Sequence, residues 1–308
     1  MGQLILTEID LDEEIFTGKA EIIRVSGRTI PKYNGNADVV AIVGCRASAN
    51  IVLNMDFPSL KIYQLTSAGY DGIPVEKFTE RGVYLCNAGD VYSIPIAETV
   101  IYGMLQYAKR YWDNPKWHFF RPARGYKYIS ELAGKKLLIM GCGHIGNAVA
   151  KRAAAFDMDI FGYNHNCHAK DGYMEMYSTR EELILKLGKF DYIVTTIPLT
   201  EETKGFLNAE LLSAMKPSAI IVNVGRQGIF NDHDLYIALK NKAIGGAVLD
   251  MFEIMPNPIT NKYRRLSNTI VVPGVSASSI QVGDRLKGHI SNNINKLLNE
   301  GKPDFAVR

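Results

Sequence analysis

The hydrophobic positions of this chain follow two alternating patterns. Short apolar runs at residues 4–6, 39–43 and 61–65 are separated by loops and by stretches with helical spacing. Runs of this length predict buried β-strands. Over residues 94–111 apolar residues recur every three or four positions, with Ser93 as a candidate cap and Pro95 in the first turn, which predicts a long helix.

The alternation continues toward the end of the chain. Apolar runs at residues 137–140, 160–163, 192–196, 220–224, 246–249 and 269–272 predict six more strands, and residues 291–298 predict a helix. Strands that alternate with helices are typical of parallel sheets. Because 308 residues are too many for one ordinary compact core, we expect two α/β domains.

Composition narrows the class of protein. With 47% hydrophobic and 22% charged residues, the chain has the composition of a globular protein, and no apolar run has the length of a membrane span. The net charge is only +3 and basic residues are scattered among acidic ones, so we expect neither a nucleic-acid nor a membrane partner. The four cysteines form no C-x-x-C pair and the first ten residues lack a basic n-region, which favours the cytoplasm and no metal site.

The strongest local motif is LLIMGCGHIGNAVA at residues 137–150. An apolar strand runs into Gly141, Gly143 and Gly146 and then into a helix, which is the G-x-G-x-x-G pattern of a dinucleotide-binding turn. The first glycine permits a tight turn, the second lets the backbone approach a pyrophosphate, and the third lets helix and strand pack closely. A glycine-rich turn without a ligand is the alternative, but strand, spacing and helix together favour NAD or NADP.

The next predicted strand ends in Asn164 and His165 instead of the usual carboxylate. An acidic side chain at this place bonds the adenosine ribose and repels a 2′-phosphate. Asn164 can bond a ribose hydroxyl without that repulsion, and His165, His168 and Lys170 would attract a phosphate. The sequence therefore favours NADP or dual use, whereas ordinary polar loop residues at these positions would leave NAD as the cofactor.

Three further segments carry recognisable motifs: VYLCNAGDVYSIPIAE (83–98), IPLTEETKGFLNAELLSAMKPSAIIVNVGRQG (197–228) and GGAVLDMFEIMP (245–256). Together they resemble the D-isomer-specific 2-hydroxyacid dehydrogenase family, which includes glyoxylate, hydroxypyruvate and phosphoglycerate dehydrogenases. With the glycine turn they cover most of the chain from residue 83 onward, in the order and with the spacing of the family. The first 80 residues match more loosely, through Arg46 and the SAGYDGI stretch at 67–73.

The resemblance implies two Rossmann-like or flavodoxin-like doubly wound parallel-sheet domains with an interdomain cleft. Residues 1–93 and 273–308 would form the substrate domain, and residues 94–272 the dinucleotide-binding domain. In the family the helix that begins the second domain helps to build a two-fold dimer, so we expect a homodimer, with Trp112 and Trp117 either in that interface or in the core. The implied cofactor contacts are Gly141, Gly143, His144, Ile145, Gly146, Asn164, Ile197, Pro198, Thr203, Val224, Gly225 and Asp250.

The family reduces a 2-oxo acid by hydride transfer, which requires a cation for the carboxylate and a proton donor for the carbonyl oxygen. Arg226, in NVGRQG, stands at the family's catalytic arginine position, and a guanidinium suits a carboxylate better than an ammonium does. Gln227 replaces the glycine that usually follows, which leaves the backbone conformation of this loop open. The resemblance also implies that Arg46 and the backbone amide of Gly69 contact the substrate.

Both members of the family's acid–base pair are absent. The family has a histidine in a T-P-H segment and a glutamate before the proline of an E-P pair, whereas VVPGVSAS and FEIMP place Gly274 and Met255 at these positions. Losing both is physically coherent, because a buried glutamate without its histidine would be an uncompensated charge, and methionine fills the space without one. His118, Tyr92 and His289 are candidate replacement donors, although an ordinary structural role is the better interpretation of each.

Two functions of different class remain open. The retained Arg226, Asp250 and glycine turn favour an NAD(P)-dependent oxidoreductase that reduces a small 2-oxo acid, such as glyoxylate or hydroxypyruvate. Met255 and Gly274 favour instead a catalytically silent dinucleotide-binding protein that acts as a sensor or partner subunit. We expect the enzyme, and the sequence does not identify its substrate.

Overall fold

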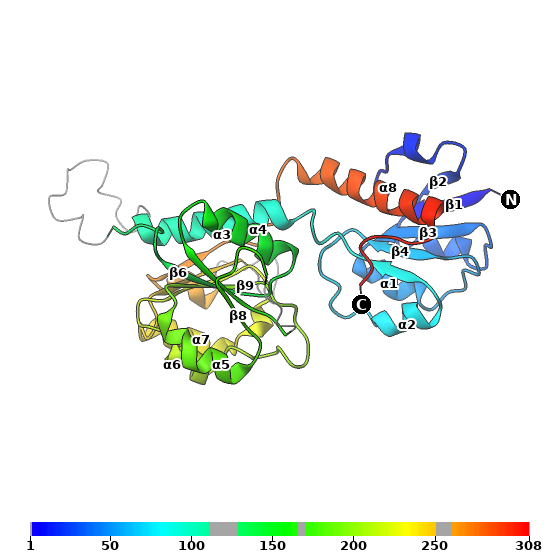
Figure 1. The fold of residues 1–308 in the computed structure, drawn as a ribbon. Coiled ribbons are helices and arrows are strands. Elements are labelled where there is room, and N and C mark those ends of the chain that lie inside the picture. The colour runs from blue at the N-terminus through cyan, green and yellow to red at the C-terminus, as the bar shows by residue number, and fades with distance from the viewer. Residues whose placement is uncertain (1, 111–128, 166–169, 251–259, 308) are drawn as a thin grey trace. The chain divides into compact units, whose positions relative to one another are not determined.

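The computed structural model describes residues 2–110, 129–165, 170–250 and 260–307, which form two compact units (Figure 1). Unit 1 comprises Met1–Tyr92 together with Ser279–Arg308, and unit 2 comprises Ser93–Ser278. Each unit contains one parallel sheet with helices on both faces. The two-domain α/β class predicted from the alternation of apolar runs is therefore confirmed.

Unit 1 has five strands in the order β2-β1-β3-β4-β5, which is the flavodoxin-like order. Its strands are β1 (Gln3–Thr7), β2 (Ala20–Arg24), β3 (Val39–Gly44), β4 (Ile62–Leu65) and β5 (Tyr84–Cys86). Its helices are α1 (Arg46–Val52), α2 (Val75–Glu80), α8 (Val282–Glu300) and the short 3-10 helices η1 (Glu13–Phe16) and η2 (Ile30–Tyr33).

Both faces of the unit 1 sheet are covered, so the central strand β3 is buried along its whole length. One face packs against α8 through Ile290, Ile294 and Leu297, which recur at helical spacing. The other face packs against α1 and α2, to which Val52 and Phe78 belong.

Unit 2 has seven strands in the order β12-β11-β10-β9-β6-β7-β8. Its strands are β6 (Lys136–Met140), β7 (Asp159–Tyr163), β8 (Glu175–Tyr177), β9 (Tyr192–Thr195), β10 (Ile220–Asn223), β11 (Gly246–Leu249) and β12 (Thr269–Val271). Its helices are α3 (Ser93–Lys109), α4 (His144–Ala154), α5 (Arg180–Lys186), α6 (Ala209–Ala214), α7 (Asp232–Lys240) and the 3-10 helices η5 (Leu187–Lys189), η6 (Gln227–Ile229) and η7 (Lys262–Arg265).

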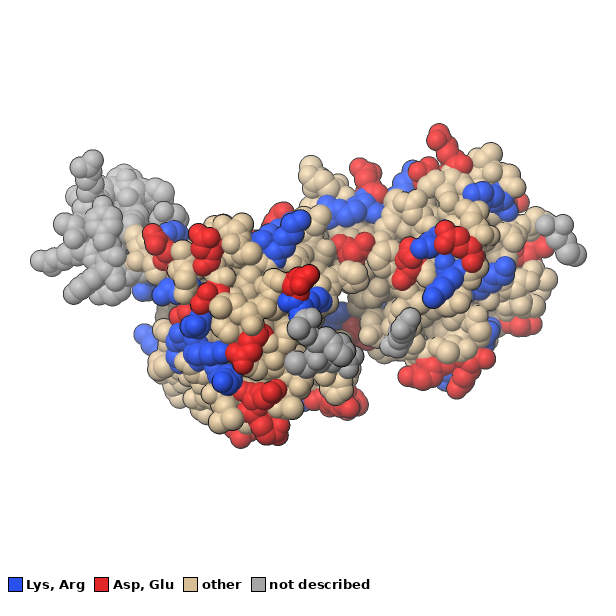
Figure 2. All heavy atoms as spheres, in the orientation of Figure 1, with Lys and Arg blue, Asp and Glu red and all other residues tan. Residues whose placement is uncertain are grey.

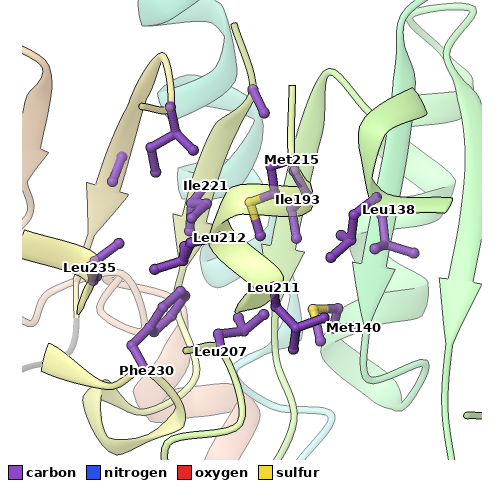
Figure 3. Packing of buried hydrophobic residues seen from close by; sticks show 14 of the residues in the cluster. Leu138, Met140, Ile193, Leu207, Leu211, Leu212, Met215, Ile221, Phe230 and Leu235 are labelled. Carbon is purple, nitrogen blue, oxygen red and sulfur yellow. The ribbon is translucent and has the colours of Figure 1, made fainter. Parts of the chain in front are cut away.

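The helices of unit 2 form two layers, with α3 and α4 on one face of the sheet and α5, α6 and α7 on the other (Figure 1). On the second face, Leu211 and Leu212 of α6 belong to one buried cluster with Met140, Ile193 and Ile221 of the central strands (Figure 3). Such interdigitated apolar side chains fix the layer of helices on the sheet, and thereby the loops that follow the strands.

The sequence missed three strands, β2, β5 and β8, for a common reason. All three are the outermost named strands of their sheets, although β5 also forms a short antiparallel bridge with the C-terminal segment at Ala306. Their segments carry exposed or partly exposed side chains, such as Glu21, Tyr84 and Glu175, so no continuous apolar run marks them. Two helix starts also differ from the prediction: α3 includes Ser93 as its first residue instead of being capped by it, and α8 begins at Val282, nine residues before the predicted start.

Charged residues of both signs are interspersed on the face of the molecule shown in Figure 2, where no broad area of one sign appears. No helix among the described residues combines the length and the apolar character needed to cross a membrane. The same part of the chain holds no group of three or more histidine, cysteine or acidic side chains arranged for a metal ion.

Candidate functional site

The glycine turn connects β6 to α4. Gly141 has a φ of +99°, and a Cβ atom on it would lie 2.8 Å from Thr196 Oγ1. A Cβ atom on Gly146 would lie 2.1 Å from the carbonyl oxygen of Gly141, whereas one on Gly143 would meet no atom within 4 Å. The chain's own packing therefore requires the first and third glycines, while the second borders open space, as it would if a ligand approached there.

The first turn of α4 presents backbone amides without a side-chain cap, because its N-cap is Gly143. His144 is exposed and Ile145 partly buried in this turn. Uncapped amides and the helix dipole make a helix N-terminus suitable for a phosphate group.

The glycine turn lies where the order of the sheet reverses. The chain runs outward from β6 through β7 to β8, and then returns to β9 on the other side of β6. Thr196, directly after β9, donates a hydrogen bond from Oγ1 to the carbonyl oxygen of Gly141 at 2.7 Å. Such switch points are where ligands bind in open α/β sheets, at the carboxyl ends of the strands.

The segment after β9 continues along this edge. Ile197 is buried and Pro198 exposed. Thr203 donates from Oγ1 to the carbonyl oxygen of Pro198 at 2.7 Å, which closes the turn. A Cβ atom on Gly225, after the next strand, would lie 3.3 Å from the carbonyl oxygen of Ile197, so the two loops are in close contact.

Arg226 follows β10 in the buried segment that contains Val224 and Gly225. Its Nη1 donates to the carbonyl oxygen of Gly225 at 3.1 Å, and its side chain is partly exposed. Asn223, which is 1% exposed, donates from Nδ2 to the carbonyl oxygen of Arg226 at 3.2 Å and accepts from the Gly225 amide at 3.1 Å. The side chain of Asn223 thus fixes the backbone that carries the arginine.

The carboxylate of Asp250, 1% exposed, is engaged by the chain itself. It accepts hydrogen bonds from the Val275 amide at 3.0 Å and from the Ser276 hydroxyl. These contacts hold the turn that contains Gly274, whose φ is +75°. An L-residue at Gly274 would adopt a left-handed conformation at a cost of about 1–2 kcal/mol. Met255, at the other position of the missing pair, lies outside the described residues.

At the end of β7, Asn164 is partly buried and His165 is exposed. Lys170 reaches back to the glycine turn, where its Nζ donates to the carbonyl oxygen of Cys142. Tyr173 ties the same loop to α4 by a hydrogen bond from its hydroxyl to Asn147 Oδ1, at 3.2 Å. A hollow of ≈ 690 Å³ lies between this loop and α4. The structure therefore places Lys170 beside the glycine turn, and the described residues at the end of β7, Asn164 and His165, include no carboxylate. His168 lies outside the described residues.

Arg46 and Gly69 belong to unit 1. Arg46 begins α1, and its Nη1 pairs with Asp71 Oδ2 at 3.3 Å, which brings it to the segment that contains Gly69. The carbonyl oxygen of Gly69 accepts a hydrogen bond from the Ser67 hydroxyl at 2.8 Å. A substrate carboxylate at Arg46 would compete with Asp71 for the guanidinium.

Two of the candidate proton donors are engaged in structural contacts. The Tyr92 hydroxyl donates to the carbonyl oxygen of Thr66, and burial raises the pKa of this phenol. The side chain of His289 is only 6% exposed, with Nδ1 2.9 Å from Asp90 Oδ1 and Nε2 3.3 Å from the carbonyl oxygen of Asn87. His289 thus packs into unit 1, and the third candidate, His118, lies outside the described residues.

Sequence reasoning missed Asn223 and Thr196 as parts of this site. Asn223 is a polar residue at the end of an otherwise apolar strand, IIVN. This position could have indicated its structural role from the sequence. A buried amide at a strand end has to find partners, so it commonly holds the loop that follows.

Comparisons with known proteins agree with this geometry. Residues 101–276, more than half of the chain, match the model of the D-isomer specific 2-hydroxyacid dehydrogenase NAD-binding domain. D-3-phosphoglycerate dehydrogenase of Methanocaldococcus jannaschii is 32% identical over 85% of this chain, which spans only 50% of that protein's length. Glyoxylate reductase of Pyrococcus furiosus is 29% identical over 94% of this chain and 87% of its own.

The fold is shared with a solved structure, a glyoxylate reductase from Paecilomyes thermophila, at a TM-score of 0.82 and 20% identity, covering 99% of this chain and 98% of that one. The matched domain model names NAD as the ligand class, in agreement with the glycine turn. This chain belongs to the D-isomer specific 2-hydroxyacid dehydrogenase family.

Proposed function

We propose that this chain is an NAD(P)H-dependent oxidoreductase that reduces a small 2-oxo acid to the 2-hydroxy acid. One observation carries the proposal: Arg226 follows β10 on the same carboxyl edge of the sheet that holds the glycine turn after β6. Only β9 separates these two strands, so the strand ends that carry Arg226 and the glycine turn are about 10 Å apart along the sheet. A dinucleotide across the switch point would extend from the turn toward the arginine.

In this proposal the bound cofactor supplies the hydride. The turn at Gly143 and the first amides of α4 would hold the pyrophosphate, and Arg226 would bind the substrate carboxylate and polarise the neighbouring carbonyl group. Gly274 has no side chain to donate a proton, so in this proposal water or a donor other than the family's histidine supplies the proton for the carbonyl oxygen. A positioned general acid contributes about 10² to 10⁴ in rate, and turnover is accordingly slower than with an acid–base pair.

The test is an assay of the purified protein with NADH and NADPH against glyoxylate, hydroxypyruvate, pyruvate and bulkier 2-oxo acids. The relative from Pyrococcus furiosus is named for glyoxylate, which is the first substrate to try. We expect slow oxidation of cofactor that requires Arg226 and disappears in Arg226→Ala. Cofactor binding without turnover on any 2-oxo acid would favour the second candidate, a silent dinucleotide-binding sensor or partner, which the absent acid–base pair supports.

We further propose that NADPH is used at least as well as NADH. Lys170 lies against the glycine turn and Asn164 brings no negative charge to the ribose. Asn164→Asp should shift the ratio of the two dissociation constants toward NADH, because a carboxylate bonds ribose hydroxyls and repels a 2′-phosphate. Lys170→Ala should weaken the binding of NADPH more than that of NADH. An unchanged ratio of the two dissociation constants in both variants would contradict the proposal.

We also propose a homodimer formed through α3 and α4. A groove of ≈ 370 Å³ is lined by Ile101, Tyr102, Leu105 and Phe156, and Tyr102 is 58% exposed. An exposed apolar face on the helix that pairs two subunits in the family favours a second copy of this chain as its partner. Tyr102→Glu should convert the dimer to a monomer in light scattering after gel filtration; a wild-type monomer would refute the assembly. The tryptophans at 112 and 117 lie outside the described residues.

A further inference from the structure

The side chain of Gln227 has a partner that fixes it in place. Its Nε2 donates to Asp232 Oδ1 at 2.8 Å. The same carboxylate oxygen accepts from the Tyr263 hydroxyl at 2.8 Å, and the other oxygen pairs with Lys262 Nζ. One carboxylate therefore joins the loop after Arg226 to the start of α7 and to η7.

The environment of Asp232 makes this junction rigid. Asp232 lies in the first turn of α7, where the helix dipole favours negative charge. Tyr263 is 1% exposed, and its hydroxyl also donates to the backbone carbonyl of Asp232 at 3.0 Å. A carboxylate with several donors from separate segments holds its direction better than one in a single exposed pair.

The backbone at Gln227 does not require glycine. Among described non-glycine residues, positive φ angles occur only at Arg110, Asp157 and Lys242. Gln227 begins η6, directly after the extended residue Arg226, whose φ and ψ are −132° and 144°. A residue with a side chain is thus accommodated without strain, and the side chain adds a tie that the family's usual glycine lacks.

We infer that Gln227 is a positioning residue for Arg226. Asn223 holds the backbone of the arginine from the side of β10, and Gln227, anchored on Asp232, holds it from the side of η6. Fixed at both ends, the loop holds the Cα atom of Arg226 in place, and the guanidinium is directed from there by its hydrogen bond to the carbonyl oxygen of Gly225 at 3.1 Å. The inference rests on the proposed function for what the guanidinium binds, since a displacement of about 1 Å in a substrate-positioning group lowers the rate by up to about 100-fold.

Gln227→Ala tests the inference. We expect kcat/KM for the 2-oxo acid to fall about 10-fold to 100-fold, with a rise in KM, while the dissociation constant of the cofactor changes less than twofold. Gln227→Glu should lower kcat/KM further, because the new carboxylate would be repelled by the carboxylate of Asp232. Combining Gln227→Glu with Asp232→Asn exchanges the donor and the acceptor of this hydrogen bond, and the double variant should recover part of the lost kcat/KM, which shows that the two side chains act through each other.

The matched control is Lys216→Ala. Lys216 pairs with Asp191 at 2.8 Å at the opposite, amino edge of the same sheet, and both side chains are partly exposed. This variant should lower thermal stability without changing kcat/KM. An equal loss of kcat/KM in the control and in Gln227→Ala would overturn the inference.

Two further readouts separate this inference from the proposed function. Oxamate, a carboxylate that resembles a 2-oxo acid and is not reduced, should bind the cofactor-loaded protein more weakly after Gln227→Ala. Hydrogen exchange at residues 224–229 should increase in the same variant, even in a protein without turnover. A silent wild type would refute the proposed function alone, whereas unchanged exchange and unchanged oxamate affinity in Gln227→Ala would refute the positioning role.

Discussion

Replacing Gly146 by alanine would place a methyl carbon 2.1 Å from the carbonyl oxygen of Gly141 and 3.1 Å from Ile139 Cγ2. The closest atom belongs to the backbone of the glycine turn, so it cannot rotate away as a side chain would. Overpacking of this kind costs about 3 kcal/mol at the upper end of its range. Alanine recovers about 1 kcal/mol through its higher helix propensity, which leaves a net loss of about 2 kcal/mol.

For a domain of this size, that loss lowers the Tm by about 4–8 °C. The displaced turn should also bind the dinucleotide more weakly. Gly143→Ala makes the matched comparison, because its methyl group would meet no atom within 4 Å and the residue's φ of −83° suits any amino acid. Its cost to folding is about 0.5 kcal/mol for a poorer helix cap.

The two variants thus separate packing from ligand approach. Gly143→Ala should keep a Tm within about 2 °C of the wild type. It should nevertheless raise the cofactor dissociation constant about tenfold or more, which is about 1.4 kcal/mol, because the methyl group stands between the backbone and the pyrophosphate. Thermal unfolding followed by circular dichroism and calorimetric titration with NADH and NADPH measure both effects. A native Tm in Gly146→Ala, or native cofactor affinity in Gly143→Ala, would refute the roles given to these glycines.

Three other outcomes are expected. The double variant Gly274→His with Met255→Glu should gain more turnover on 2-oxo acids than the two single variants together. Its Tm should fall, because position 274 has a φ of +75°, a left-handed conformation that costs an L-residue about 1–2 kcal/mol. A double variant that folds and binds cofactor but gains no turnover would show that more than the acid–base pair is missing. Tyr107→Phe should lower the free energy of unfolding by about 1 kcal/mol, measured by denaturant titration, because the lost hydroxyl donates to the carbonyl oxygen of Asn268 at 2.6 Å and accepts from the Ala247 amide at 3.0 Å. Burial alone would raise the pKa of Asp232, but hydrogen bonds from Lys262, Tyr263 and Gln227 outweigh burial and hold this pKa below its usual value. The charged carboxylate therefore stabilises the fold above the unfolded-state pKa, and this stabilisation is lost as the pH falls through the folded-state pKa. The Tm values of Asp232→Asn and the wild type should differ at neutral pH and converge in acid.

The sequence alone was sufficient for the fold class and for the dinucleotide turn. Apolar runs predict strands that are buried on both faces, and such strands make up the centre of both sheets, as in β3 and β10. The glycine spacing at residues 141–146 predicts a backbone turn whose reasons are steric and local. Edge strands such as β8 escaped prediction because their side chains face solvent in part, which removes the periodic signal.

Only the tertiary structure decided which polar groups support the site. Thr196 lies far from Gly141 along the chain, and its role comes from the pairing of parallel strands that end at one edge. Asn223 and Asp232 look like ordinary polar residues in the sequence, and only the folded path of the loop after β10 brings them to Arg226 and Gln227. The sequence did not determine the backbone conformation at Gln227. In the structure the Gln227 side chain donates a hydrogen bond to the carboxylate of Asp232, which also accepts one from Tyr263 of η7. Hydrogen bonds between separate segments depend on distance and direction in space, whereas a sequence pattern records only spacing along the chain.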